Sequence, residues 1–188
     1  MTLRLNIIVT STRPGRIGPA VGTWVHQHAV ATGGFDARLV DLAEFNLPIY
    51  DEPNQPHLRQ YAHDHTRRWS ESVDAADAFV FVTPEYNSGP TPALTNALNY
   101  LFKEWEYKPA AFVSYGGISG GMRGVTSVRG LFPVLRMMPI PDGVPLPNVF
   151  AQIGEDGAFT PKDVNVKGAD RMLSELLRWA EALKPMRG

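Results

Sequence analysis

The chain has 188 residues, of which 44% are hydrophobic and 20% are charged, and its formal net charge is -1. This composition predicts one globular domain spanning residues 1–188, and its near-neutral charge argues against nucleic acid or a membrane surface as a partner. The absence of cysteine excludes disulfides, thiolate catalysis and cysteine-ligated metal. Because the sequence shows neither a signal-peptide pattern nor a membrane-spanning apolar run, we expect a cytoplasmic protein.

Five apolar runs predict β-strands. In chain order they cover residues 3–9, 35–42, 79–83, 110–115 and 144–152. The third run is apolar on both faces, which is typical of a central strand in a parallel sheet covered by helices on both sides.

Helical spacing of apolar residues predicts five helices between and after these strands. They cover residues 17–31, 58–76, 92–105, about 121–137 and about 162–183. The proline-rich segment 139–147 is expected to be a rigid surface connection into the last strand. Alternation of strand and helix over the whole chain predicts a doubly wound α/β sheet.

Three polar loops follow the first, third and fourth predicted strands. They cover residues 10–18, 84–91 and 115–121, and they are the stretches richest in Gly, Ser, Thr and Asn. In an open parallel sheet, ligands bind beyond the carboxyl ends of the strands, where the strand order reverses. These loops are therefore the candidate site.

The first loop, TSTRPGRIG, has the composition of a phosphate site. The helix that begins near Ile17 offers free amides, Ser11 adds a hydroxyl donor, and Arg13 or Arg16 adds a charge. The alternative is that Ser11 or Thr12 caps a turn and the arginines face water. The glycine spacing matches neither G-x-G-x-x-G nor a P-loop, so a mononucleotide phosphate suits the loop better than a pyrophosphate.

The other two loops are suited to a flat ring. In residues 84–91, two prolines limit the backbone and Tyr86 can pack beside a heteroaromatic ligand, although an ordinary strand-to-helix turn is the alternative. In residues 115–121, four glycines let the backbone approach a ligand closely, and their amides can stabilise the negative charge that a reduced flavin develops. Glycine-rich turns that bind no ligand are the alternative here.

Several other polar and aromatic residues have structural interpretations. Asp41 ends the second strand and is expected to be a surface residue. His63 and His65 are expected to point to different faces of a helix, so they predict no metal site. Core or subunit packing is the expected role of the tryptophans, which are Trp24, Trp69, Trp105 and Trp179.

Three motifs together resemble the NAD(P)H-dependent FMN reductase family, which includes quinone, azo and chromate reductases. They are TSTRPGR, PEYNSGPTPALTNALNYL and YGGISGGMRG, in the order and spacing of that family, and the resemblance covers essentially all of the chain. The resemblance implies a flavodoxin-like three-layer sandwich. Its five-stranded parallel sheet has the order 2-1-3-4-5, helices on both faces, and FMN where the order reverses.

The resemblance also implies the residues that bind FMN. At the phosphate these are Ser11, Arg13, Ile17 and Gly18, with Arg16 at the rim. At the isoalloxazine ring they are Pro84, Glu85, Tyr86, Asn87 and Ser88. At the pyrimidine edge they are Tyr115, Gly116, Gly117 and Gly120, largely through backbone groups.

The implied activity is an FMN-dependent oxidoreductase that takes hydride from NADPH or NADH and passes electrons to a flavin, a quinone or a similar small acceptor. The resemblance implies that no side chain is catalytic and that no metal is bound. It also implies a homodimer or homotetramer. The sequence departs from the family at Thr10, usually glycine, and at Thr95 and Asn99, usually lysine and aspartate. The alternatives are a non-enzymatic FMN-binding electron carrier or interaction module, disfavoured by the near-neutral charge, and a nicotinamide-only dehydrogenase, disfavoured by the glycine spacing.

Overall fold

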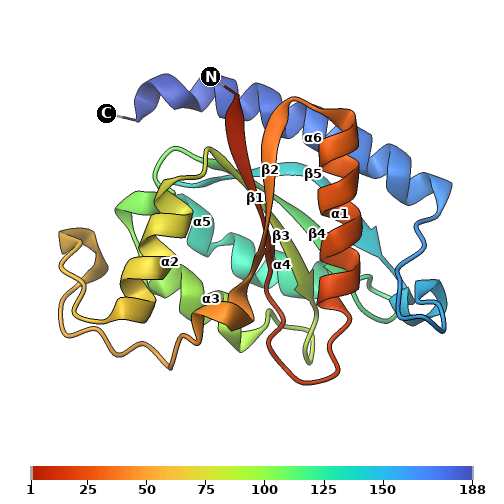
Figure 1. The fold of residues 1–188 in the computed structure, drawn as a ribbon, viewed down its shortest axis with the longest axis horizontal. Helices are drawn as coiled ribbons and strands as arrows, with labels where there is room; N and C mark the ends of the chain where they lie inside the picture. The colour runs from red at the N-terminus through yellow and green to blue at the C-terminus, as the bar shows by residue number, and fades with distance from the viewer. Residues whose placement is uncertain (1, 188) are drawn as a thin grey trace.

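Five parallel strands form the central layer of the protein (Figure 1). The computed structural model describes residues 2–187, and the strands lie in the order β2-β1-β3-β4-β5. Their bounds are Leu3–Val9 (β1), Phe35–Asp41 (β2), Ala78–Pro84 (β3), Pro109–Tyr115 (β4) and Met138–Leu146 (β5). The chain goes from β1 outward to β2 and then returns to the other side of β1 for β3. This confirms the expected sheet and places the reversal of strand order between β1 and β3.

Helices cover both faces of the sheet. On one face lie α1 (Gly18–Thr32) and α6 (Asp163–Leu183). On the other lie α2 (Asp64–Asp74), α3 (Pro92–Asn99), α4 (Met122–Arg129) and α5 (Leu131–Val134). Since successive strand residues point to opposite faces, Val80 and Val82 enter the first core, whereas Phe79 and Phe81 enter the second.

The tryptophans anchor these two cores. Trp24 packs against Phe159 in the α1–α6 core, and Trp179 is half-buried beside the same core. Trp69 and Trp105 are fully buried in the other core, where their ring centroids lie 5.8 Å apart. The expected packing role is therefore confirmed.

The last strand begins earlier than its sequence indicates. Of the segment 139–147, expected to be a connection, residues 139–146 belong to β5, and the strand ends at Leu146 rather than reaching 152. Met138 donates its amide to Lys108, and Leu146 accepts from Gly116, so these positions face β4. By alternation, the neighbouring prolines at 139 and 145 face the open edge, where an edge strand tolerates a missing N–H. Prolines were therefore a misleading sign of a loop here.

Three helices are shorter than predicted. The segment 58–63 precedes α2, because Arg59 adopts a left-handed conformation with φ 54°. The chain leaves α3 after Asn99 and forms a short 3-10 turn at Lys103–Trp105. The predicted helix 121–137 divides into α4 and α5, and Pro133 lies in α5 without an amide to donate.

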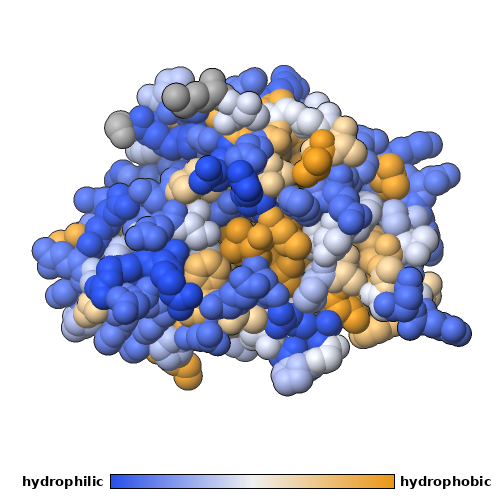
Figure 2. Space-filling view, in the orientation of Figure 1, coloured by the Kyte–Doolittle hydropathy of each residue, from blue (hydrophilic) through white to orange (hydrophobic). Residues whose placement is uncertain are grey.

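The surface of this view is largely hydrophilic, with an apolar patch in its middle over the region of β2 (Figure 2). Leu39 of β2 is 41% exposed. Within residues 2–187, no helix combines the length and the apolar character needed to cross a membrane.

Candidate functional site

The three polar loops meet at one edge of the sheet. They are named after the strands they follow: the first loop (10–18) follows β1, the third loop (84–91) follows β3 and the fourth loop (115–121) follows β4. Val9 pairs with Val82, and Pro84 pairs with Tyr115, so the carboxyl ends of β1, β3 and β4 are level with one another. Thr10 then donates its amide to the Val82 carbonyl over 3.0 Å, which fixes where the first loop leaves the sheet.

A buried hydroxyl pair supports the first loop from below. Tyr115 donates its hydroxyl to Ser11 Oγ over 3.2 Å, and both residues are buried. Burial raises the pKa of Tyr115 to about 12, so this hydroxyl keeps its proton at neutral pH. A Cβ on Gly18 would lie 2.3 Å from Ser11 Oγ, so glycine is required for the helix to begin this close. The structure thus places the Tyr115 side chain under the first loop, while its backbone lies at the start of the fourth loop.

The two arginines of the first loop have different surroundings. Arg13 is exposed and donates to the Pro14 carbonyl over 3.1 Å. Arg16 forms an ion pair with Asp41, and both side chains are 20% exposed. Asp41 also accepts the amide of Ala43 over 3.0 Å. Asp41 is therefore a half-buried positioning group for Arg16, rather than the surface residue that its place at a strand end indicated.

The third loop is a tight turn with fixed geometry. Tyr86 and Gly89 exchange backbone hydrogen bonds of 3.0 and 2.9 Å. Between them, Asn87 and Ser88 both have left-handed φ angles, 49° and 63°, as in a type I′ turn. Asn87 and Ser88 are exposed at the edge, and the strained backbone holds them there.

The fourth loop owes its shape to glycine and to one buried serine. Gly120 and Gly121 have φ angles of 60° and 86°, which residues with a Cβ rarely adopt. Ser114 donates its hydroxyl to the Gly120 carbonyl over 2.8 Å and secures the turn. No atom of residues 2–187 lies within 4 Å of a Cβ built on Gly117, so this part of the loop faces open space.

Glu85 connects the third and fourth loops. Its amide donates to the Tyr115 carbonyl over 3.1 Å, and its carboxylate accepts the Ser119 hydroxyl over 2.7 Å. Burial raises the pKa of Glu85, but the hydrogen bonds from Ser119 and the Arg123 amide outweigh it, and the net pKa lies below its ordinary value. The carboxylate is therefore ionised at neutral pH.

Two buried polar atoms at this edge fit a bound nucleotide. Arg16 Nε and the Tyr86 hydroxyl are buried and have no hydrogen-bond partner within residues 2–187. Buried donors in native proteins are nearly always satisfied, and a ligand with acceptor oxygens or ring nitrogens would satisfy both. The first donor adjoins the loop that has the composition of a phosphate site, and the second belongs to the loop suited to a flat ring. The residues present therefore fit FMN.

Other residues at this edge carry weaker sequence signals. Thr10 is fully buried, and its carbonyl accepts the hydroxyl of Thr91 over 3.3 Å. Thr91 also caps α3 by accepting the amide of Leu94 over 3.1 Å. Thr10 and Thr91 thus join the first loop to α3, the helix that follows the third loop. A hydroxyl directly after a strand and another directly before a proline-led helix were the available signals.

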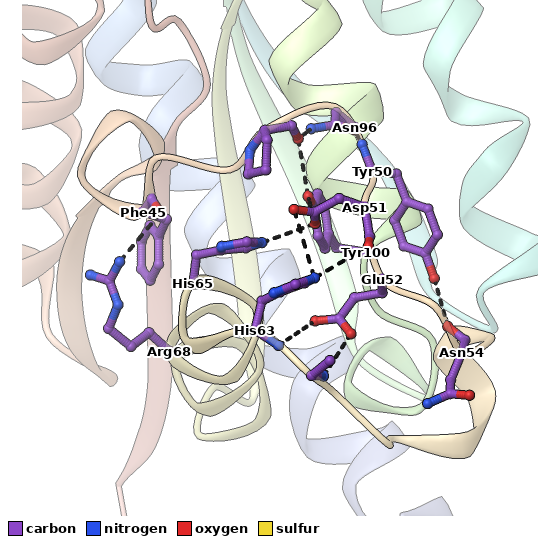
Figure 3. Close-up of polar contacts among 12 residues, drawn as sticks. Phe45, Tyr50, Asp51, Glu52, Asn54, His63, His65, Arg68, Asn96 and Tyr100 are labelled. Atoms are coloured by element: carbon purple, nitrogen blue, oxygen red, sulfur yellow. Dashed lines mark hydrogen bonds and ion pairs between the residues drawn. The ribbon is translucent and has the colours of Figure 1, made fainter.

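The histidines of α2 lie differently from the expectation. His63 precedes the helix in an extended conformation, so its ring stacks on His65 with centroids 5.2 Å apart. Both rings face Asp51, which also accepts the hydroxyl of Tyr100 over 2.8 Å (Figure 3). In the described chain, no group of three or more His, Cys, Asp or Glu is arranged to hold a metal ion. This cluster fastens the segment 46–63 to α3.

Comparisons with known proteins agree with this geometry. A Nectria protein named NAD(P)H-dependent FMN reductase is 35% identical over 96% of this chain and 89% of its own length. A Schizosaccharomyces pombe protein of the same description is 41% identical over 64% of this chain, and the match spans 62% of that relative's length. Further relatives are named as an NADPH azoreductase and as NADPH:quinone oxidoreductases.

The fold recurs in a solved flavoenzyme. The NAD(P)H:(acceptor) oxidoreductase FerB from Paracoccus denitrificans superposes with a TM-score of 0.76 at 18% identity, over 96% of this chain and 98% of its own. Residues 3–151 match the family described as NADPH-dependent FMN reductase. The matched residues include all three candidate loops. The chain therefore belongs to the NADPH-dependent FMN reductase family.

Proposed function

We propose that the chain is a single FMN-binding domain that oxidises NADPH or NADH and passes the electrons to a small acceptor. The observation that carries the proposal is a pair of buried donors with no partner in the described part of the chain, Arg16 Nε and the Tyr86 hydroxyl, on two of the three polar loops. Membership of the family gives these donors an identified ligand, FMN.

In this proposal the first loop holds the phosphate. Arg13 is exposed, its charge has no carboxylate partner in the described structure, and it can bind a phosphate with charge-assisted hydrogen bonds. Ser11 offers its hydroxyl, and the amides of Ile17 and Gly18 at the start of α1 add the positive end of a helix dipole. Arg16, held by Asp41, forms the rim.

The third and fourth loops hold the ring in the same proposal. Pro84, Glu85 and the rigid Tyr86–Gly89 turn form one wall, from which Asn87 and Ser88 project. The backbone of Tyr115, Gly116, Gly117 and Gly120 forms the other. The amides of Gly116 and Gly120 already donate to the carbonyls of Leu146 and Gly117, so among the described residues of this wall the Gly117 amide is the one that can donate to a flavin. A donor at the pyrimidine edge would raise the reduction potential of the flavin by stabilising negative charge there.

FMN supplies the hydride and electron chemistry when bound, so no side chain has to act as acid, base or nucleophile. The chain's own contribution is position: its loops fix the ring, leave one face accessible and supply donors before the ligand arrives. Quinones and azo compounds are the acceptor classes that we propose, because relatives carry the names of quinone and azo reductases. A cytoplasmic location, where NAD(P)H is regenerated, completes the proposal.

We also propose that the chain forms a homodimer or homotetramer through the outer side of α3. A shallow hollow of about 560 Å³ lies there, lined by Leu47, Ile49, Pro92, Ala93, Thr95, Asn96 and Asn99. Ile49 is 91% exposed at this hollow, and a second copy seated there would bury it. Light scattering of the purified chain tests this, and a monomer at all concentrations would refute it.

The function is tested by titrating the purified protein with FMN and with riboflavin, followed by turnover with NADPH and NADH. We expect FMN to bind with its fluorescence quenched, riboflavin to bind more weakly because it lacks the phosphate, and nicotinamide oxidation to require FMN. Protein that binds FMN but does not oxidise either nicotinamide would be an electron carrier. Protein that binds neither flavin would refute the proposal.

A further inference from the structure

The carboxylate of Glu85 crosses from the loop after β3 to the loop after β4. Oε2 accepts the hydroxyl of Ser119 over 2.7 Å and the amide of Arg123 over 3.0 Å. Oε1 lies 3.5 Å from the Arg123 guanidinium. The Glu85 side chain is only 10% exposed, so this network is largely shielded from water.

The partners of Glu85 are themselves tied to the glycine turn. Ser119 Oγ also accepts the amide of Gly121 over 3.3 Å, so one hydroxyl joins Glu85 to the turn. The Arg123 amide belongs to the first turn of α4, where amides have no partner within the helix. A single carboxylate thus acts as an N-terminal cap for α4 and as a brace for the loop that precedes it.

We propose that Glu85 is a positioning residue that sets the separation between the two walls of the flavin site. This inference rests on the proposed function, and it differs from the expected role of Glu85 as a direct contact of the ring. Oε2 is already occupied by two donors, and Arg123 balances the charge. The carboxylate therefore shapes the fourth loop before FMN arrives, which lowers the ordering cost of binding.

Charge supports this role. Arg123 is the charged side chain paired with Glu85, and the other hydrogen bonds come from Ser119 and from the backbone amides of Arg123 and Gly124 at the start of α4. A reduced flavin carries negative charge, so an unpaired carboxylate beside it would oppose reduction. Because Arg123 and these hydrogen bonds compensate Glu85, the loop gains a brace without placing an isolated negative charge at the site.

The test compares FMN-free and FMN-bound protein for Glu85→Ala, Glu85→Gln and Ser119→Ala. Glu181→Ala is the matched control, since Glu181 is exposed on α6, away from this edge. Hydrogen exchange without FMN measures whether residues 117–123 loosen. Fluorescence titration then gives FMN affinity, and the visible spectrum at saturating FMN reports the surroundings of the ring.

We expect Glu85→Ala to speed exchange in residues 117–123 and to weaken FMN binding on the order of 10- to 100-fold, the range for charged hydrogen bonds. Glu85→Gln keeps an acceptor oxygen and should restore most of the protection, the affinity and the spectrum. Ser119→Ala should cause a smaller loss, and adding it to Glu85→Ala should cost little more. The control should match the wild type.

Three results would overturn the inference. Unchanged hydrogen exchange and unchanged FMN affinity in Glu85→Ala would show that the third and fourth loops keep their positions without the Glu85 carboxylate. Lost affinity with unchanged exchange would make Glu85 a direct flavin contact. If Glu85→Ala does not fold, unchanged exchange in Ser119→Ala would refute the brace. Wild-type protein that fails to bind FMN would instead refute the proposed function, while exchange in the free protein still tests the brace.

Discussion

The two arginines of the first loop have different surroundings, which predict different roles in the proposed phosphate site. Arg13 is exposed and bonded only to the neighbouring Pro14 carbonyl in the described structure, so its charge is available to a ligand. Arg16 is held by Asp41, which reduces its effective charge. The sequence could place both arginines in the loop, because the strand before it and the helix after it were plain. It could not show the partner of Arg16, because Asp41 lies 25 positions away in the chain.

Replacing Arg13 by alanine should weaken FMN binding by about 1.5 to 3 kcal/mol, the contribution of a charge-assisted hydrogen bond. Arg16→Ala should cost less, because Asp41 already pairs with the guanidinium through Nη2 and leaves Nε as the donor for a ligand. Fluorescence titration of both variants measures the difference, with Arg178→Ala on α6 as the control. Equal losses for Arg13 and Arg16 would show that the assigned roles are wrong.

Gly121 provides a second prediction for a single residue. Its φ of 86° strains any other residue, and a Cβ would lie 2.6 Å from the Tyr115 amide nitrogen. Gly121→Ala should therefore lower the free energy of unfolding by at least about 1 kcal/mol. Gly130→Ala is the matched control, because Gly130 has helical angles and open space at its Cβ position, and it should be neutral or slightly stabilising. Chemical denaturation compares the two, and equal stability would contradict the account.

Among the elements, strand β5 and the segment before α2 departed most from the sequence pattern. Apolar runs and helical spacing were sufficient to predict β1, β3, β4, α1 and α6. The pattern of apolar residues within each of these segments shows which of its residues are buried. The edge strand β5 carries prolines that an inner strand would exclude, so local composition indicated a loop. The segment 46–63 is held by side chains from α2 and α3, which no local pattern shows.

Asp51 is the residue through which that segment is best tested. Burial raises the pKa of Asp51, but hydrogen bonds from Tyr100 and His65 lower it by more than burial raises it. The net pKa of Asp51 is therefore below its ordinary value. A carboxyl group whose pKa is lowered by folding stabilises the folded state at any pH above its ordinary pKa. This contribution is lost as the pH falls through the lowered pKa. Asp51→Asn should therefore speed hydrogen exchange in residues 46–63 at neutral pH. The same effect from Glu44→Gln, an exposed control, would contradict a specific role.

At the scale of the whole molecule, one partly buried tyrosine and two buried ones tie the two cores to the loops around the sheet. Burial is the largest cause that raises the pKa of Tyr61, Tyr100 and Tyr115, and hydrogen bonds to Glu104 and Asp51 add to it for the first two. The fold class could be predicted from strand and helix order alone, because right-handed crossovers leave few arrangements. The tyrosine contacts could not, since each joins elements far apart in the chain.

These tyrosines predict how stability depends on alkaline pH. A group whose folded pKa is raised stabilises the protein below its ordinary value, near 10 for tyrosine, and that contribution is lost as pH rises toward the folded value. The free energy of unfolding should therefore fall above about pH 10. Tyrosine absorbance and circular dichroism should change together, because the buried hydroxyls ionise on unfolding. Full ionisation of all six tyrosines before any loss of circular dichroism would be incompatible with this account.

The central claim is that the three loops at the carboxyl edge bind FMN so that a nicotinamide can reduce it. The direct measurement is anaerobic: purified protein is mixed with equimolar FMN, NADPH or NADH is added, and the yellow absorbance is followed, with FMN alone as the blank. We predict that the absorbance bleaches only with protein present, and that it returns when a quinone is added. If the absorbance with protein falls no faster than in the blank, with NADPH and with NADH, the claim is contradicted.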